Sequence, residues 1–371
     1  MKKIINQQDM KERNAADVFA FVKKSGVATR KEIAEQLSMS WGAVSTITAL
    51  LLEAGYLTER KSAEGGTAGR IPSRLSVNEE IYYAVGLDIN DTGLRAVAAD
   101  LSDRVIASFS AEASFKSPDA LFECVATLVE EVIAAVPHMR PICIGAAMQG
   151  IVDAENGVSL RIPGRQNWQN APLSAMLEQR FHIPVFLRHD PDCILYAYAK
   201  RVDERNAMLV RVDHGIGMAA MLDGEIIARP GIFELGHTVV VPGGAPCGCG
   251  KRGCLDQYAS IRGMKTRANA KFSALATAAK NGDREAQALF SDAARYLALA
   301  ITNTAGLLSV DHVLLCGRLF DFKALFFPEL ISESRNLSPL APLNFVLTNV
   351  TDAPLGAALI AMNAALRKIG I

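Results

Sequence analysis

Apolar residues near the start of the chain recur at helical spacing and predict a small helical head. A first helix is expected over residues 15–24, and Thr29 with Glu32 forms a capping-box pattern that begins a second. After a short turn, Ser40 caps a third helix, which ends at Gly55. Two helices joined by a tight turn, the second beginning with small polar residues, indicate a helix-turn-helix.

The residues after the third helix predict a wing. Two short strand patterns flank a glycine-rich tip at residues 62–72, so the winged head spans residues 1–78. This head carries 12 Lys and Arg against 8 Asp and Glu, a surplus of four, in a chain whose net charge is zero. A modestly basic head on an acidic body suits contact with phosphates.

We therefore predict that the head binds double-stranded operator DNA. The third helix would enter the major groove, and the Gly-Arg-Ile-Pro segment at residues 69–72 would insert an arginine into a narrow, A·T-rich minor groove. A three-helix module that contacts protein is the alternative. The predicted DNA contacts are Thr29, Arg30, Ser40, Trp41, Gly42, Ala43, Ser45, Thr46, Arg60, Lys61, Arg70 and Arg74.

The remaining residues alternate between strand and helix patterns. Three successive strands are expected between residues 82 and 108, followed by a helix near 121–135 and a strand near 142–148. The same order begins again at residue 207. Two halves that each begin with a three-strand meander predict a duplicated α/β body, and ligands of such folds usually bind in the crevice between the halves.

These patterns divide the 371-residue chain into three parts. After the head, we expect a first α/β lobe over residues 79–195 and a second over 196–354, with a helix at 355–371 packing back on the first lobe. No uninterrupted apolar run reaches 18 residues, and no apolar stretch follows the two lysines at the N-terminus. We therefore expect a soluble cytoplasmic protein without membrane insertion.

One imidazole and three thiols fall within 18 residues and predict a metal site. Three thiolates and a neutral imidazole form a closed tetrahedral set for zinc, with no position left open for catalysis. A disulfide with a spare thiol is the alternative, but the cysteine count is odd, at seven, and nothing marks the chain for export. The predicted ligands of a structural Zn²⁺ are His237, Cys247, Cys249 and Cys254.

The same segment resembles the signature of a known family. Glu-x-Gly-His at residues 234–237, then Cys-x-Cys-Gly-x-x-Gly-Cys-Leu-Asp at 247–256, resembles the ROK family of repressors and sugar kinases. With Val-Asp-His-Gly-Ile-Gly at 212–217 and the winged head, the chain is most similar to its NagC/Mlc/XylR-type transcriptional repressors. The resemblance covers nearly the whole chain. It implies an actin-like, hexokinase/RNase H-like two-lobed body, a sugar or sugar-phosphate effector, and a homodimer or tetramer.

Three phosphate-binding segments depart from the pattern of ROK kinases. The first loop, Asp-x-Gly-Gly-Thr in kinases, is Asp-Ile-Asn-Asp-Thr at residues 88–92. The second replaces glycines and a threonine at residues 213–218, and the late Gly-Gly-Gly motif is Cys-Gly-Arg at 316–318. A carboxylate about 5 Å from a phosphate charge costs roughly 3 kcal/mol at an effective dielectric near 20. We therefore predict that kinase activity is lost and expect no catalytic residue.

The sugar side keeps more of the family pattern. By resemblance, Asp190 is a vestigial general base, and Glu234 and His237 are sugar contacts. Asp190 could alternatively cap a helix, and Arg165 could be either a contact to an acidic ligand group or a solvated loop residue. The predicted sugar-site residues are Asn167, Arg165, His189, Asp190, Glu234, His237 and Asp256, which stands where the family commonly has Glu.

These observations favour a sugar- or sugar-phosphate-responsive repressor of carbohydrate-metabolism genes. A ROK sugar kinase with an added DNA-binding head is the alternative, because Asp88, Thr92 and Asp190 stand at their family positions. A third interpretation is a regulator titrated by a membrane transporter rather than by a small molecule. The identity of the hexose-like ligand stays open at this stage.

Overall fold

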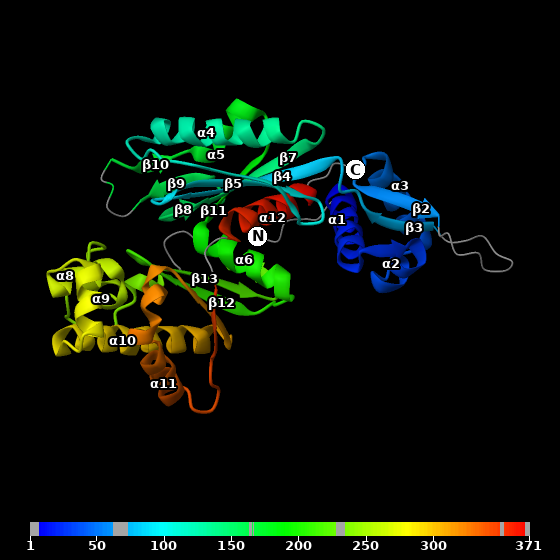
Figure 1. The fold of residues 1–371 in the computed structure, drawn as a ribbon. Coiled ribbons are helices and arrows are strands. Elements are labelled where there is room, and N and C mark those ends of the chain that lie inside the picture. The colour runs from blue at the N-terminus through cyan, green and yellow to red at the C-terminus, as the bar shows by residue number, and fades with distance from the viewer. Residues whose placement is uncertain are drawn as a thin grey trace. The chain divides into compact units, whose positions relative to one another are not determined.

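The computed structural model describes residues 7–61, 73–162, 165, 167–227, 234–348 and 352–367. Contacts among its residues form two compact units (Figure 1). The first unit contains the chain up to Gly150, Glu155–Arg188 and the segment from Ala357 onward. The second contains Ile151–Ala154 and His189–Gly356. None of the described helices is long and apolar enough to cross a membrane.

The head has the predicted winged helix-turn-helix arrangement. The capping box is present, since the Thr29 hydroxyl accepts a hydrogen bond from the Glu32 backbone and the Glu32 carboxylate accepts one from Thr29 N at 2.7 Å. Ser40 caps the third helix by accepting from Ala43 N at 3.2 Å. The head's elements are α1 Gln7–Ser25, β1 Val27–Thr29, α2 Arg30–Gln36, α3 Trp41–Glu53, β2 Leu57–Lys61 and β3 Ser73–Val77, with the sheet in the order β1-β3-β2.

The head packs tightly against the rest of the first unit. The rings of Tyr56 and Tyr82 stack with centroids 4.9 Å apart, and the Tyr82 hydroxyl donates to Ala54 O at 3.0 Å. On α1, Lys23 forms an ion pair with Asp103 at 2.6 Å. Aromatic stacking and a partly buried hydrogen bond therefore join the wing side of the head to the first strand of the body.

A five-stranded sheet in the order β11-β7-β4-β5-β6 forms the centre of the first unit. Helices α4 and α12 cover opposite faces of it (Figure 1). A Cβ at Gly145 would lie 2.0 Å from Ala357 O, so glycine is required where α12 crosses β7. The elements are β4 Tyr82–Asn90, β5 Gly93–Asp100, β6 Val105–Ala111, α4 Pro118–Ala135, β7 Arg140–Met148, α5 Leu173–Phe181, β11 Val185–His189 and α12 Ala353–Leu366. A small sheet adds β8 Ile151–Asp153, β9 Val158–Arg161 and β10 Gln169–Ala171.

The second unit repeats this strand order, as β16-β15-β12-β13-β14. In both sheets the first strand of the meander lies antiparallel to the second and parallel to the fourth. The predicted duplication of an α/β unit is thus confirmed. The elements are α6 Asp190–Val202, β12 Ala207–Val212, β13 Ile216–Leu222, β14 Glu225–Ile226, η1 Leu235–His237, α7 Asp256–Ala259, α8 Ile261–Ala268, α9 Phe272–Lys280, α10 Arg284–Leu308, β15 His312–Cys316, η2 Arg318–Leu325, α11 Phe327–Leu337 and β16 Asn344–Leu347.

Candidate functional site

The predicted metal ligands converge in the second unit. Their ligand atoms all lie within 4.8 Å of one another: His237 at the end of η1, and Cys247, Cys249 and Cys254 in the following loop. The Sγ atoms of Cys249 and Cys254 are 3.6 Å apart, and so are Cys247 Sγ and His237 Nδ1. A tetrahedral metal with bonds of about 2.3 Å to sulfur and 2.0 Å to nitrogen would set these separations at about 3.8 and 3.5 Å. The four residues could therefore hold a metal ion.

Short backbone contacts shape the loop around this centre. Val239 and Cys254 form an antiparallel bridge, and so do Pro246 and Arg252. Gly253 has a φ of +79°, and a Cβ there would lie 1.6 Å from a backbone oxygen, so only glycine fits. The fold thus presents four donors from residues that are close in sequence.

Two predicted sugar-site carboxylates lie next to the metal ligands in the chain. Asp256 begins α7 two residues after Cys254; it is 2% exposed and pairs with Arg262 at 2.8 Å. Glu234 precedes η1, and its backbone oxygen accepts from His237 N at 2.9 Å. Burial raises the pKa of Glu234, with a smaller opposing effect from Lys251. A metal at this centre would hold both carboxylates in place through the backbone.

Asp190 is the first residue of α6, and the residue is 4% exposed. The N-cap position belongs to His189, whose side chain makes no capping bond. The Asp190 carboxylate instead pairs with Arg211 through Oδ2, and its Oδ1 lies 3.4 Å from His189 Nε2. Burial lowers the pKa of His189, although Asp190 opposes this effect. The structure thus gives Asp190 partners other than the helix N-terminus.

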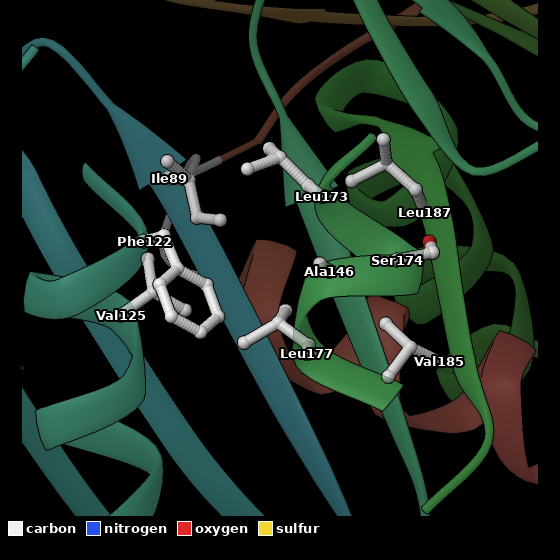
Figure 2. Close-up of a pocket in the computed structure, with 9 residues that line it drawn as sticks. All are labelled: Ile89, Phe122, Val125, Ala146, Leu173, Ser174, Leu177, Val185 and Leu187. Carbon is white, nitrogen blue, oxygen red and sulfur yellow. The ribbon is translucent and has the colours of Figure 1, made fainter. Parts of the chain in front are cut away.

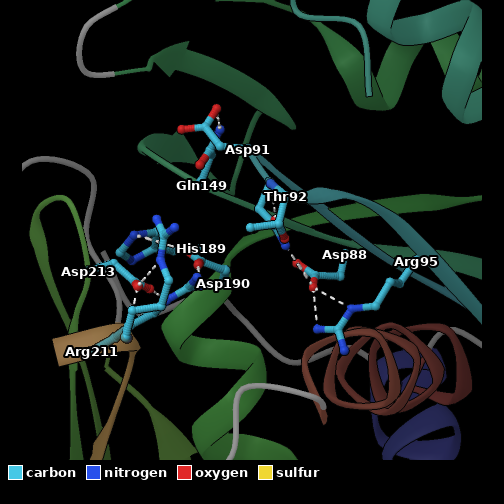
Figure 3. A network of polar contacts seen from close by, with 11 residues as sticks. Asp88, Asp91, Thr92, Arg95, Gln149, His189, Asp190, Arg211 and Asp213 are labelled. Atoms are coloured by element: carbon cyan, nitrogen blue, oxygen red, sulfur yellow. Dashed lines mark hydrogen bonds and ion pairs between the residues drawn. The ribbon is translucent and has the colours of Figure 1, made fainter. Parts of the chain in front are cut away.

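The segment that corresponds by resemblance to the second phosphate loop of kinases contains ion pairs. Arg211 lies between Asp190 and Asp213 (Figure 3), and its Nε donates to Asp213 Oδ2 at 2.7 Å. Arg318 donates to Asp213 Oδ1 from its backbone N at 2.9 Å and from its Nε at 3.1 Å. Burial would raise the pKa of Asp213, but Arg211 and the bonds from Arg318 together hold it below its usual value. The acid is therefore stabilised as a carboxylate.

The first phosphate loop shows a similar pattern within the first unit. Asp91 accepts hydrogen bonds from Arg165 at 2.7 Å and from Gln149 at 2.9 Å. Asp88 pairs with Arg95 at 2.6 Å (Figure 3). The Arg165 guanidinium also lies over the Phe115 ring, 4.3 Å from its centroid. Arg165 thus has protein partners in the first unit, and its side chain is 36% exposed.

The remaining predicted sugar-site residue, Asn167, is exposed in the first unit. A pocket in the same unit is lined almost wholly by apolar side chains from β4, β7, β11, α4 and α5 (Figure 2). Its Ile89 projects from the face of β4 opposite to Asp88, because side chains alternate along a strand. The pocket therefore lies on the other side of the sheet from the polar loop residues, and its chemistry does not suit a sugar.

Most of the predicted DNA contacts lie on α3 or on the wing. On α3, Trp41, Gly42 and Thr46 are exposed, and Ala43 and Ser45 are half-buried. On the wing, Arg60 and Arg74 are exposed and directly opposite each other in the β2–β3 ladder. Lys61 ends β2, and Arg70 lies outside the described residues.

Thr29, Arg30 and Ser40 have structural partners within the head. The hydroxyls of Thr29 and Ser40 cap α2 and α3. The Arg30 guanidinium donates to Thr48 at 3.0 Å, to Glu59 at 2.5 Å and to Ser73 at 3.0 Å. Arg30 therefore ties α2 to α3 and the wing strands.

Sequence reasoning missed Arg211. The sequence did indicate its importance, because this arginine is the one charged residue in the apolar strand Ala-Met-Leu-Val-Arg-Val. In the structure the valines on either side of it are fully buried. A buried charge requires a partner. What the strand pattern could not supply was the identity of the two carboxylates that meet it.

Comparison with known proteins agrees with this architecture. The model of the ROK family matches residues 84–358. The DNA-binding transcriptional repressor Mlc of Escherichia coli is 26% identical over 261 residues, covering 68% of this chain and 64% of that protein, slightly under two thirds of its length. The xylose repressor of Caldicellulosiruptor bescii is 23% identical over 357 residues, covering 88% of this chain and 87% of the repressor.

Solved structures share the fold. A ROK family transcriptional regulator, described as a homologue of the Escherichia coli Mlc protein, superposes with a TM-score of 0.83 at 22% identity, covering 98% of this chain and 99% of that one. The ROK hexokinase of Thermus thermophilus superposes with a TM-score of 0.69 at 25% identity, covering 76% and 98%. The hexokinase likeness agrees with the predicted actin-like body, and the regulator likeness extends over the head.

Proposed function

This chain belongs to the ROK family, and we propose that it is a sugar-responsive transcriptional repressor that has lost phosphoryl transfer. Relatives named as repressors match it over the head as well as the body. The observation that carries the proposal is the pairing of Asp213 with Arg318. Two residues that replace phosphate-loop glycines bind each other, where a kinase needs open backbone amides.

The head supplies the DNA-binding surface. An exposed α3 beginning with Trp41 and Gly42 would enter the major groove, and Arg60 and Arg74 on the wing would contact phosphates. Lys61, Arg70, Ser45 and Thr46 belong to the same proposed surface. Thr29, Arg30 and Ser40 would act by holding the head together rather than by touching DNA.

The sugar would bind to carboxylates and imidazoles of the body. Asp190, Glu234 and Asp256 are buried or half-buried acceptors for sugar hydroxyls, and His189 and His237 offer ring nitrogens beside them. Arg165 and Asn167 stay proposed ligand contacts from the first unit. Because Arg165 already pairs with Asp91, a ligand acid would have to compete for it.

Zn²⁺ is the metal that suits the three thiols and one imidazole. It would contribute structure rather than chemistry, since four protein donors complete its coordination. His237 would then serve both as a metal ligand and as a sugar contact. We also propose that the protein forms a homodimer or tetramer, because two heads would read a near-palindromic operator.

The test is a mobility-shift titration of the purified protein with promoter fragments from its own genomic neighbourhood, with and without a panel of hexoses, pentoses and amino sugars. We expect saturable retardation of at least one fragment and a shift in its Kd on addition of one sugar. An effector shifts DNA binding only by its differential affinity for the two states. Failure to retard any fragment under all conditions would refute the proposal.

The second candidate is a sugar kinase with an added head, which the likeness to a ROK hexokinase favours. It predicts ADP release with one of the same sugars. A coupled ADP assay decides between the two candidates: turnover that vanishes in Asp190→Asn supports the kinase, and absence of turnover supports the repressor.

A further inference from the structure

Arg211 is a largely buried arginine in a strand of the second unit. It lies in β12 between Val210 and Val212, both fully buried, and its side chain is 18% exposed. In the sheet it is paired with Gly217 of β13 and Cys316 of β15. A guanidinium in such a place is stabilised only by carboxylates that meet it, because desolvation of a lone charge costs several kcal/mol.

Two carboxylates meet Arg211 from different segments. Its Nη1 donates to Asp190 Oδ2, and its Nε donates to Asp213 Oδ2 at 2.7 Å (Figure 3). One guanidinium thus joins the first residue of α6 to the loop after β12. Its planar donors have fixed directions, so both carboxylates are oriented as well as neutralised.

Asp213, at one end of this network, is hydrogen-bonded to the backbone. Asp213 accepts from Arg318 N at 2.9 Å, at the beginning of η2. The preceding Gly317 has a φ of +101°, and a Cβ there would lie 2.4 Å from Val212 O. The loop after β15 therefore sits directly against β12. Asp213 is held on one side by this loop and on the other by Arg211.

The two carboxylate oxygens of Asp190, at the other end of this network, are engaged to different degrees. Oδ2 is taken by Arg211, whereas Oδ1 faces His189 Nε2 at 3.4 Å, beyond a short hydrogen bond. The Asp190 carboxylate cannot turn without breaking its ion pair. It is therefore presented in one orientation before any ligand arrives.

We propose that Arg211 is a positioning residue of the sugar site, held by Asp213 and Arg318, which orients Asp190 so that Oδ1 accepts a ligand hydroxyl. The inference rests on the proposed function, in which Asp190 contacts the sugar. The second phosphate loop thereby supports ligand recognition instead of holding a nucleotide.

The test is a double-mutant cycle on the full chain, measured by isothermal titration calorimetry with D-xylose, D-glucose and N-acetyl-D-glucosamine as probes. The variants are Arg211→Met, Asp190→Asn and both together. For the probe that binds the wild type, Arg211→Met is expected to weaken binding roughly 10- to 100-fold, the range for a hydrogen bond to a charged group. If Arg211 acts through Asp190, the double variant binds no more weakly than the weaker single variant.

Two further variants separate positioning from folding. Arg211→Lys keeps the charge and is expected to recover part of the lost affinity. Asp213→Asn leaves the contact between Arg211 and Asp190 in place, so it is expected to weaken binding less than Arg211→Met, in the same direction. Arg295→Met, which removes an exposed arginine of α10, is the matched control and is expected to bind as the wild type does. Thermal unfolding by circular dichroism identifies any variant that fails to fold, and Asp213→Asn then carries the test.

The outcomes are distinct. Unchanged or tighter binding in Arg211→Met, or effects that add fully in the double variant, would overturn the positioning role while leaving the repressor intact. Failure of the wild type to bind all three probes and the wider sugar panel would instead refute sugar recognition itself, and the inference with it. Non-additive loss with recovery by lysine supports the inference.

Discussion

Asp213 accepts two hydrogen bonds from Arg318, one from the backbone N at 2.9 Å and one from the guanidinium Nε at 3.1 Å. These residues stand at glycine positions of two separate phosphate-binding segments of ROK kinases. The Asp213 carboxylate alone would repel a phosphate, and Arg318 places a cation against that carboxylate.

Asp91 and Arg165 repeat this relationship in the first unit, with 2.7 Å between carboxylate and guanidinium. Each acid introduced into a phosphate loop has thus acquired an arginine partner. An incoming phosphate would have to compete with the Asp91 or Asp213 carboxylate for the arginine that each of them already binds. This competition favours a body that binds its ligand without a nucleotide.

The proposed zinc site should respond selectively to cysteine substitution. Cys247→Ser removes one of four ligands, so the purified protein is expected to fall from about one bound zinc per chain to a small fraction of that value and to unfold at lower temperature. Cys124→Ser, outside the cluster, is the control and should retain the metal. Inductively coupled plasma mass spectrometry gives the metal content; a metal-free wild type would contradict the assignment.

Trp41 is 59% exposed on α3, so its removal should weaken DNA binding and leave the stability of the fold unchanged. Trp41→Ala is expected to weaken operator binding by about 1–3 kcal/mol, or roughly 5- to 150-fold, with little change in melting temperature. Leu307→Ala, at a side chain that is 88% exposed on α10, should change neither quantity. Retained operator affinity in Trp41→Ala would show that α3 is not the reading helix.

Arg30 and Arg74 should behave oppositely, although both are arginines of the head. Arg30→Ala removes one hydrogen-bond partner each from Glu59 and Thr48 and is expected to lower the free energy of unfolding by about 1–3 kcal/mol. Arg74→Ala is expected to leave stability unchanged and to reduce the slope of log K against log salt by about one. Urea unfolding and salt-dependent mobility shifts measure the two effects, and a reversed pattern would exchange the two roles.

Because the His189 ring is partly buried, we expect the folded protein to lose stability on acidification. Burial lowers its folded pKa, so the unfolded chain binds a proton first as the pH falls below about 6.5. Above that pH, the neutral His189 ring makes its full contribution to the free energy of unfolding. As the pH falls further, this contribution declines by at most about 1.4 kcal/mol per pH unit, until the folded pKa is reached. Urea unfolding at about pH 7.5 and pH 5.5 should therefore show a smaller loss in His189→Gln than in the wild type. The exposed His138→Gln should keep the wild-type loss, and equal losses in all three proteins would contradict the prediction.

Alanine substitutions at Gly317 and Gly282 test how closely the loop after β15 approaches β12. Both have positive φ values, +101° and +90°, but only Gly317 has backbone atoms where a Cβ would stand. Gly282→Ala should cost about 1 kcal/mol from strain alone, whereas Gly317→Ala should cost several kcal/mol. Equal melting temperatures for the two variants would show that the loop moves aside easily.

Local sequence patterns were sufficient to predict much of the fold and one of the candidate sites. The capping box of Thr29 and Glu32, the Ser40 cap and the His237–Cys254 ligand set were all recognisable in sequence, because each involves groups within a few residues of one another. Strand and helix periods likewise predicted the duplicated α/β body. Boundaries were less accurate: α1 begins at Gln7 and α4 at Pro118, earlier than the apolar periods suggested.

The partners of the arginines were decided only by the tertiary structure. Arg30 was predicted to contact DNA from its place in the helix-turn-helix, yet it binds Glu59, which is 29 residues away. Arg211 and Arg318 meet Asp213 because the carboxyl ends of the parallel strands β12 and β15 reach the same edge of the sheet. An ion pair forms between whichever charges the fold brings within about 4 Å, and strand order sets that proximity over a hundred residues of chain.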